Sequence, residues 1–327
     1  MKTLDHYIRV FSKLKRSPHA VWSEGTKKKA PHKPIFLLSL LDLVSRGLLQ
    51  TNFVDLSRDL GELTDLFNSY WSRVVPPGQV SSIAFPFLHL HSEGLWKLVP
   101  VQGHSSDFSR LPNIKTVPQL KEIALGAEIE KDLFECMQSN DNRNALRQTL
   151  LRSCFSEAAQ KALEQQAMIN ADAYSYSLEL IKKSHEPVVS ELVINSIMPE
   201  PVRDQGFRRA IVTTYDHRCA LCGVRIITPE GHTAVDAAHI KPWSISKNDD
   251  VRNGMALCKL CHWTFDEGFI GVSERYTVLV SRQLSSTPNM PGLLTTLDDR
   301  AIITPADNEL WPAQEYLGWH RREFRLG

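Results

Sequence analysis

The chain has 327 residues, with 38 lysine and arginine residues against 37 aspartate and glutamate residues, and 42% of its residues are hydrophobic. This length and near-average composition predict two or three globular domains and exclude a disordered or low-complexity chain. No apolar run reaches the ~18 residues that a membrane-spanning helix needs. The N-terminus also lacks the apolar stretch of a signal peptide, so a cytoplasmic protein with no membrane partner is expected.

The positive charge is concentrated at one end of the chain. Residues 1–50 hold ten basic and three acidic side chains, a local balance of +7. Chains that contact phosphate backbones often concentrate charge in this way, although a solvated lysine-rich loop has the same composition.

Residues 1–110 are expected to mix helices with short strands. Pro34 suits the first turn of a helix, and the apolar run after it predicts a helix that ends near Gly47. A second helical stripe of apolar residues begins at Leu60. The alternating segment 81–100 predicts two strands joined by a turn.

Residues 111–200 are expected to form a helical connector without clustered chemistry. Asp141 stands at the start of a predicted helix with an apolar stripe at positions 146, 150, 151 and 155. Prolines then mark a domain boundary near 185–203.

Residues 201–327 contain two CxxC pairs, Cys219 with Cys222 and Cys258 with Cys261. In a cytoplasmic chain, paired CxxC units indicate a metal site rather than disulfides. Two thiolates from each tight turn complete a tetrahedron, so the sequence predicts a structural Zn²⁺ with no open coordination position.

Three further residues lie among these pairs at defined intervals. His239 precedes Asn253 by fourteen residues, and His262 follows Asn253 by nine. At DHRCALCG, VDAAHIKPW, RNGMALCKLC and HWTFDEG the sequence resembles the HNH endonuclease family in its four-cysteine, McrA-like form. The resemblance implies a ββα-metal fold in which strands carry the first histidine and a helix carries the last.

The resemblance also assigns roles that suit hydrolysis of a phosphodiester. This reaction needs a base to activate water and a cation to stabilise charge on the phosphate. His239 would be the base, because a histidine can be neutral near pH 7 and accept a proton. Asn253 would hold the loop and orient His239, and His262 would bind a catalytic divalent ion such as Mg²⁺ or Mn²⁺.

A second metal ligand is less clearly marked. Many family members carry an acid or histidine directly before the base, where this chain has Ala238. Asp236 projects from the same side of a strand as Ala238, so it is the candidate ligand, although an exposed strand carboxylate would satisfy the same pattern. Asp266 is expected to be a structural cap.

The first block carries a second resemblance. Residues 30–34 (APHKP) precede the apolar helix, and residues 84–90 (AFPFLHL) precede residues 94–98 (GLWKL). This arrangement resembles the sulfur-binding domain found in front of HNH nucleases that restrict phosphorothioate-modified DNA. A phosphorothioate carries a larger, poorly hydrated sulfur atom, so its recognition calls for an apolar cup together with cations for the surrounding phosphates.

The sulfur-binding resemblance implies specific contact residues. His32 and Lys33 would meet the DNA backbone, and Phe85 and Pro86 would form part of the cup. Phe85 lacks the hydroxyl of the tyrosine common in the family, and Lys33 offers a point charge where arginine offers a planar fork. A plain helix start at His32 and Lys33, and core packing at Phe85 and Pro86, are the structural alternatives.

Three consecutive lysines, Lys27, Lys28 and Lys29, could follow a DNA backbone or simply keep the protein soluble. They complete the set of candidate DNA-binding residues.

The expected fold class is therefore α+β. An N-terminal mixed α/β DNA-reading domain (1–110) precedes a helical connector (111–200), and a ββα-metal HNH domain (201–327) with a four-cysteine zinc site ends the chain. The expected function is a type IV-like restriction endonuclease that recognises phosphorothioate-modified double-stranded DNA and hydrolyses nearby phosphodiesters. Cutting both strands would favour a homodimer or sequential nicking.

Two alternatives stay open at this point. An HNH restriction enzyme that reads a methylated or otherwise modified base would need stacking aromatic side chains and hydrogen-bond donors. A non-catalytic, zinc-stabilised DNA-binding protein would not need His239, Asn253 and His262, since zinc binding alone requires none of them.

Overall fold

The computed structural model describes residues 2–19, 21–79, 81–103, 114–185, 198–285 and 292–326. Its chain divides into two compact units, which we call the first unit (Met1–Ala171 with Thr228–His232) and the second unit (Asp172–Ile227 with Thr233–Gly327). The expected boundary at residue 110, and most of the one expected at 185–203, lie outside the described residues. The segment expected to be a connector is divided between the two units.

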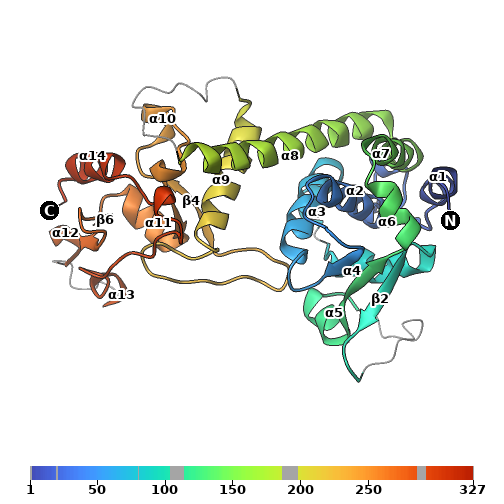
Figure 1. Cartoon of the computed structure of the whole chain (residues 1–327), viewed down its shortest axis with the longest axis horizontal. Coiled ribbons are helices and arrows are strands. Elements are labelled where there is room, and N and C mark those ends of the chain that lie inside the picture. The colour runs from blue at the N-terminus through green and yellow to red at the C-terminus, as the bar shows by residue number, and fades with distance from the viewer. Residues whose placement is uncertain are drawn as a thin grey trace. The chain divides into compact units, whose positions relative to one another are not determined.

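The first unit combines helices with a small sheet (Figure 1). Its elements are α1 (Leu4–Ser12), η1 (Glu24–Thr26), α2 (His32–Ser45), β1 (Phe53–Asp55), α3 (Leu60–Val74), α4 (Ala84–His89), η2 (Leu90–Glu93), β2 (Trp96–Pro100), α5 (Val117–Ile123), β3 (Ala124–Ile129), α6 (Lys131–Met137) and α7 (Asn140–Cys154), followed by α8 (Glu157–Lys183), which continues into the second unit.

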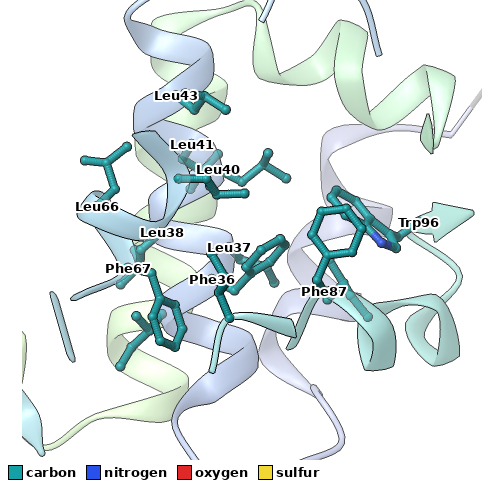
Figure 2. Packing of buried hydrophobic residues seen from close by; sticks show 14 of the residues in the cluster. Phe36, Leu37, Leu38, Leu40, Leu41, Leu43, Leu66, Phe67, Phe87 and Trp96 are labelled. Carbon is teal, nitrogen blue, oxygen red and sulfur yellow. The ribbon is translucent and has the colours of Figure 1, made fainter. Parts of the chain in front are cut away.

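Helix α2 forms the centre of this unit and confirms the helix predicted after Pro34. It is apolar on every side, and all its residues from Lys33 to Val44 are buried. A helix of this kind must be enclosed by other elements, and α3, α4 and α7 contact it. Figure 2 shows its Phe36 beside Phe87 and Trp96, with ring centroids 5.9 and 5.4 Å away.

The sheet of the first unit has the antiparallel order β1-β3-β2. Its central strand β3 comes from the segment expected to be purely helical. Gly126 on β3 lies against the partner strand so closely that a Cβ atom would come within 2.2 Å of Val54 O, so only glycine fits there.

The prediction of two strands over residues 81–100 is wrong for its first half. That half forms α4 and η2, and only β2 is a strand. Pro86 lies in the first turn of α4, where a backbone N–H is not needed, and Ser82 Oγ accepts a hydrogen bond from the N–H of Ala84 at 3.2 Å. Gly94, at φ 70°, then turns the chain into β2.

The second unit is built around two antiparallel strands and the helices on either side of them. Besides the end of α8, its elements are α9 (Glu200–Thr214), β4 (Val235–His239), α10 (Trp243–Ser246), η4 (Val251–Asn253), β5 (Gly254–Cys258), α11 (Lys259–Asp266), β6 (Ile270–Val272), β7 (Val278–Val280), α12 (Arg282–Ser285), α13 (Gly292–Thr295), η5 (Asn308–Leu310) and α14 (Gln314–Phe324).

Strands β4 and β5 pair over their whole length, from Val235 opposite Cys258 to His239 opposite Gly254. Helix α11 follows β5 without a loop, and both α9 and α11 contact the strand pair. Among the described residues, no helix is long and apolar enough to cross a membrane.

Candidate functional site

Aromatic side chains from three parts of the first unit surround His32, the first residue of α2. The ring centroids of Trp22, Trp71 and Phe85 lie 5.3, 4.8 and 5.2 Å from that of His32. His32 and Phe85 line a pocket of about 400 Å³, together with Trp22 and the exposed residues Lys15 and His19. We call it the His32 pocket.

The His32 pocket combines the ring of His32 with the cationic side chains of Lys15, Arg16 and Lys33. His32 Nδ1 is buried without a hydrogen-bond partner in the described part of the chain. Burial lowers the pKa of His32 to about 4, so the ring is neutral at pH 7. Lys33 also lines the pocket, but its ammonium group forms an ion pair with Glu93 and donates to Ser92 Oγ at 3.1 Å.

The other predicted DNA-binding residues have different positions. Pro86 is buried inside α4 and is not among the described residues that line the His32 pocket. The side chain of Lys27 donates to the carbonyl oxygen of Arg152 at 2.6 Å, and Lys28 pairs with Glu24 at 2.8 Å. Lys29 forms an isolated antiparallel bridge with Pro18. The three lysines thus take part in local contacts outside the pocket lining.

The second unit has a cleft of about 300 Å³ that brings together His239 at the end of β4 with His262 and Asp266 from α11. His262 Nε2 lies 3.5 Å from Asp266 Oδ2, an i,i+4 pair on one face of the helix. Burial raises the pKa of Asp266, and the nearby His262 acts in the opposite direction. We call this cavity the histidine cleft.

Two neighbours fix the ring of His239. Phe207 of α9 stacks on it, with the ring centroids 4.0 Å apart and the planes at 10°. Asp249 Oδ1 lies 2.8 Å from its Nε2. Opposite His239 on β5, Gly254 makes room for this stack, because a Cβ atom there would lie 2.8 Å from Phe207 Cζ and 2.4 Å from Ile211 Cδ1.

Asn253 closes the loop between β4 and β5 and is fully buried. Its side-chain oxygen accepts from Lys241 N at 2.9 Å, and its Nδ2 donates to Lys241 O and Asn248 O, both at 3.0 Å. These three hydrogen bonds hold the two ends of the loop together. The ring of His239 forms its hydrogen bond with Asp249 instead.

Asp236 lies on the opposite side of β4 from His239. Ala237 and His239 both line the histidine cleft, and successive strand residues point to opposite faces. The carboxylate of Asp236 pairs with Arg208 Nε at 2.9 Å. The structure therefore brings Asp266, and not Asp236, together with His262.

The four cysteines predicted as a metal site form a cluster. One sulfur from each of Cys219, Cys222, Cys258 and Cys261 lies within 4.8 Å of the other three, and Cys222 Sγ is 3.7 Å from Cys258 Sγ. A tetrahedral zinc site with Zn–S bonds of about 2.3 Å has sulfur atoms about 3.8 Å apart. The donor set and its spacing thus fit Zn²⁺.

Two models of known protein families match separate parts of the chain. The family model of the ScoMcrA-like DNA sulfur-binding domain matches residues 12–169, and the HNH endonuclease model matches residues 219–273. The chain thus contains one region similar to a DNA sulfur-binding domain and another similar to an HNH endonuclease domain. No curated protein matches it. A solved structure titled "Modification dependent TagI restriction endonuclease" is 20% identical with a TM-score of 0.29, covering 42% of this chain and 44% of that chain. The chain thus spans less than half the length of that protein.

The sulfur-binding domain holds the whole His32 pocket, and the match continues past residue 110 through β3 and α7. The HNH domain holds His239, Asn253, His262 and the four cysteines. Sequence reasoning missed Trp22, Trp71 and Asp249, and it assigned Asp266 only a capping role. The i,i+4 spacing of His262 and Asp266 on a helix was the signal that could have found the latter pair.

Proposed function

We propose that the chain is a modification-dependent restriction endonuclease that binds phosphorothioate-modified double-stranded DNA and hydrolyses phosphodiesters near the modification. The observation that carries this proposal is the His32 pocket, lined by aromatic rings and cationic side chains, in the same chain as the histidine cleft of an HNH domain.

The lining of the His32 pocket favours sulfur over oxygen. A phosphate oxygen placed against Phe85 and Trp22 would lose hydration without a full set of hydrogen bonds in return. Sulfur is less hydrated, so it loses less on entering and gains contact with apolar rings. His32 is neutral, and Lys33 is already paired with Glu93. Neither residue therefore offers an unpaired charge that would attract phosphorothioate and phosphate equally.

The phosphates beside the modification need cations that are accessible from solvent. Of the cationic residues that line the pocket, Lys15 is exposed and Arg16 is half-buried. Lys33 would join them where a phosphate replaces Glu93 as its partner. Backbone contacts of this kind position the duplex and give binding a dependence on salt concentration.

The second unit supplies the cleavage chemistry. We infer that β4, β5 and α11 form a ββα-metal module in which His239 takes the proton of the attacking water. Asn253 keeps the loop closed so that the base stays at the edge of the cleft. His262 and Asp266 are the donors that would hold a divalent ion such as Mg²⁺ or Mn²⁺. When bound, that ion would stabilise negative charge on the phosphate and on the leaving oxygen.

The four-cysteine cluster has a structural role in this proposal. Zn²⁺ held by four thiolates has no open position for water or substrate. Cys258 ends β5 and Cys261 lies in the first turn of α11, so the ion would fix the start of the helix that carries His262. The zinc site thereby contributes to the geometry of the histidine cleft.

The test compares otherwise identical duplexes that carry a phosphorothioate of defined stereochemistry, a methylated base or no modification. We expect the full chain with Mg²⁺ or Mn²⁺ to cleave only the first, and the His239→Ala variant to bind it without cleaving. Cleavage confined to the methylated duplex would indicate a base reader. Binding without cleavage by the zinc-loaded wild type under every metal condition would indicate a non-catalytic DNA-binding protein.

A further inference from the structure

Asp249 stands out because its carboxyl group is completely buried. It lies in the loop between α10 and η4, and its exposed fraction is 0%. Removal of a carboxylate from water costs several kcal/mol unless other groups compensate the charge. The groups that surround Asp249 therefore indicate its role.

Two side chains besides His239 face this carboxylate. Tyr176, from the part of α8 in the second unit, donates its hydroxyl to Asp249 Oδ2 at 3.1 Å, and Arg203 Nη1 of α9 lies 3.7 Å from Oδ1. The guanidinium of Arg203 is itself fixed over the ring of Trp243 at 3.8 Å. Burial and the neighbouring Asp249 raise the pKa of Tyr176 well above its usual value, so its hydroxyl is always a donor.

This set of partners holds the carboxylate in one orientation. Tyr176 and Arg203 come from two different helices, and Gly206 allows those helices to approach, because a Cβ atom there would lie 2.9 Å from Ala173 O and 2.7 Å from Tyr176 Cδ1. The remaining contact of Asp249 Oδ1 is the ring nitrogen of His239 at 2.8 Å.

We propose that Asp249 is a positioning residue for the base of the HNH domain. It fixes His239 in the tautomer that carries its proton on Nε2, which leaves Nδ1 to accept the proton of the attacking water. The inference rests on the proposed function, because it assigns a role in the hydrolysis carried out at His239.

The two neighbours of His239, Phe207 and Asp249, constrain its ring in different ways. Stacking on Phe207 restricts the plane of the ring but has no preference between the two nitrogens. A carboxylate accepts hydrogen bonds only, so Nε2 must be the donor. The same negative charge stabilises the imidazolium that forms when Nδ1 takes up a proton, as an aspartate does behind the histidine of serine proteases.

The principal test is Asp249→Asn in the full, zinc-loaded chain. An amide can present its N–H to Nε2, which favours the tautomer with the proton on Nδ1. We expect the single-turnover rate at saturating protein to fall by about 10²–10⁴-fold, with little change in the affinity for modified DNA. An unchanged rate would overturn the proposal.

Two further variants separate positioning from a general loss of structure. Asp250→Asn changes the adjacent carboxylate, which accepts from Arg252 N at 2.8 Å, and should cleave at close to the wild-type rate. Tyr176→Phe removes one donor to Asp249 and should slow cleavage by no more than about tenfold. A loss as large in Asp250→Asn as in Asp249→Asn would contradict a specific role for Asp249.

A measurement on the wild-type chain does not depend on any variant folding. The ¹⁵N chemical shifts of the His239 ring, assigned by comparison with His239→Ala and measured where the ring is neutral, should show Nε2 protonated and Nδ1 unprotonated. The reverse pattern would overturn the inference whatever the chain cleaves. If the wild type cleaves no duplex while the expected tautomer is present, the proposed function fails and the structural assignment of Asp249 remains.

Discussion

Each unit places a histidine against aromatic rings, but the two histidines differ in what binds their nitrogens. His32 lies among Trp22, Trp71 and Phe85, and its buried Nδ1 has no partner within the described residues. His239 stacks on one ring and has a buried carboxylate 2.8 Å from Nε2. Under the proposed function, the two settings would suit two tasks: a neutral ring for a poorly hydrated ligand, and a ring with a defined tautomer for proton transfer.

The largest effect should come from removal of one thiolate, because this should abolish the function of the second unit and leave DNA binding by the first unit. Structural zinc in small domains contributes about 10–16 kcal/mol of apparent binding free energy, comparable to the whole stability of a domain. We expect Cys258→Ser to lose its zinc and to leave the second unit unfolded, while modified DNA still binds. Elemental analysis, protease digestion and gel shifts would measure the three outcomes. Full cleavage activity without zinc would contradict the structural role.

The next effect concerns the base. His239→Ala should reduce the cleavage rate by about 10²–10⁴-fold, because water would no longer be deprotonated at the cleft. The preference for modified over unmodified DNA should stay the same. Single-turnover cleavage and gel shifts on the same preparation would measure both. His32→Phe is the matched comparison, and it should alter DNA affinity while leaving the rate of bound DNA nearly unchanged.

The environment of His32 predicts a pH dependence of stability. The folded pKa of about 4 lies below the usual 6.5, so above pH 6.5 both states are neutral and full stability is present. As the pH falls from 6.5 towards 4 the unfolded chain binds the proton first, and the first unit loses up to about 3 kcal/mol. Hydrogen exchange of the α2 amides would follow this loss. The His32→Gln variant should show a flatter dependence, and equal slopes would contradict burial of a neutral ring.

The smallest effect tests selection within the His32 pocket. Phe85 is 38% exposed at the pocket, so Phe85→Ser removes only part of an apolar contact. We expect the affinity ratio between sulfur and oxygen duplexes to fall by about tenfold at most. Lys15→Ala should instead weaken both duplexes and reduce the salt dependence by about one unit of slope. Gel-shift titrations at several salt concentrations would distinguish these results, and equal affinity of the wild type for both duplexes would rule out sulfur recognition.

The features that the sequence predicts well are those with a local signal. The two CxxC spacings predict the cluster of cysteines, and the apolar run after Pro34 predicts α2. The helix predicted from the apolar stripe at residues 146, 150, 151 and 155 is α7, where the first three are buried in the helix and Phe155 follows its last residue. Each signal depends on residues within a few turns of one another, so the rest of the fold is not needed to interpret it.

The features that were missed depend on contacts between distant segments. Trp71 of α3 and Trp22 meet at His32 because α3 packs on α2 and the segment before α2 folds back to it, and no spacing in the chain records that meeting. Asp249 lies in a loop without periodicity. The alternation over residues 84–90 is ambiguous, since the buried side of a short helix and of a strand can hold the same apolar residues.

Gly254 has a consequence for how the sequence of the HNH domain can change. The residue bears no side chain that could touch DNA or a metal ion, yet a methyl group there would collide with Phe207 and Ile211. Ile211 and Phe207 would then have to shift, and a shift of Phe207 would change its stacking on His239. In a mutational scan, position 254 should therefore tolerate replacement less well than an exposed strand position. Two different requirements would thus restrict the residue type at neighbouring positions. Asn253 is required for the hydrogen bonds within the loop, and Gly254 is required because a larger residue would not fit.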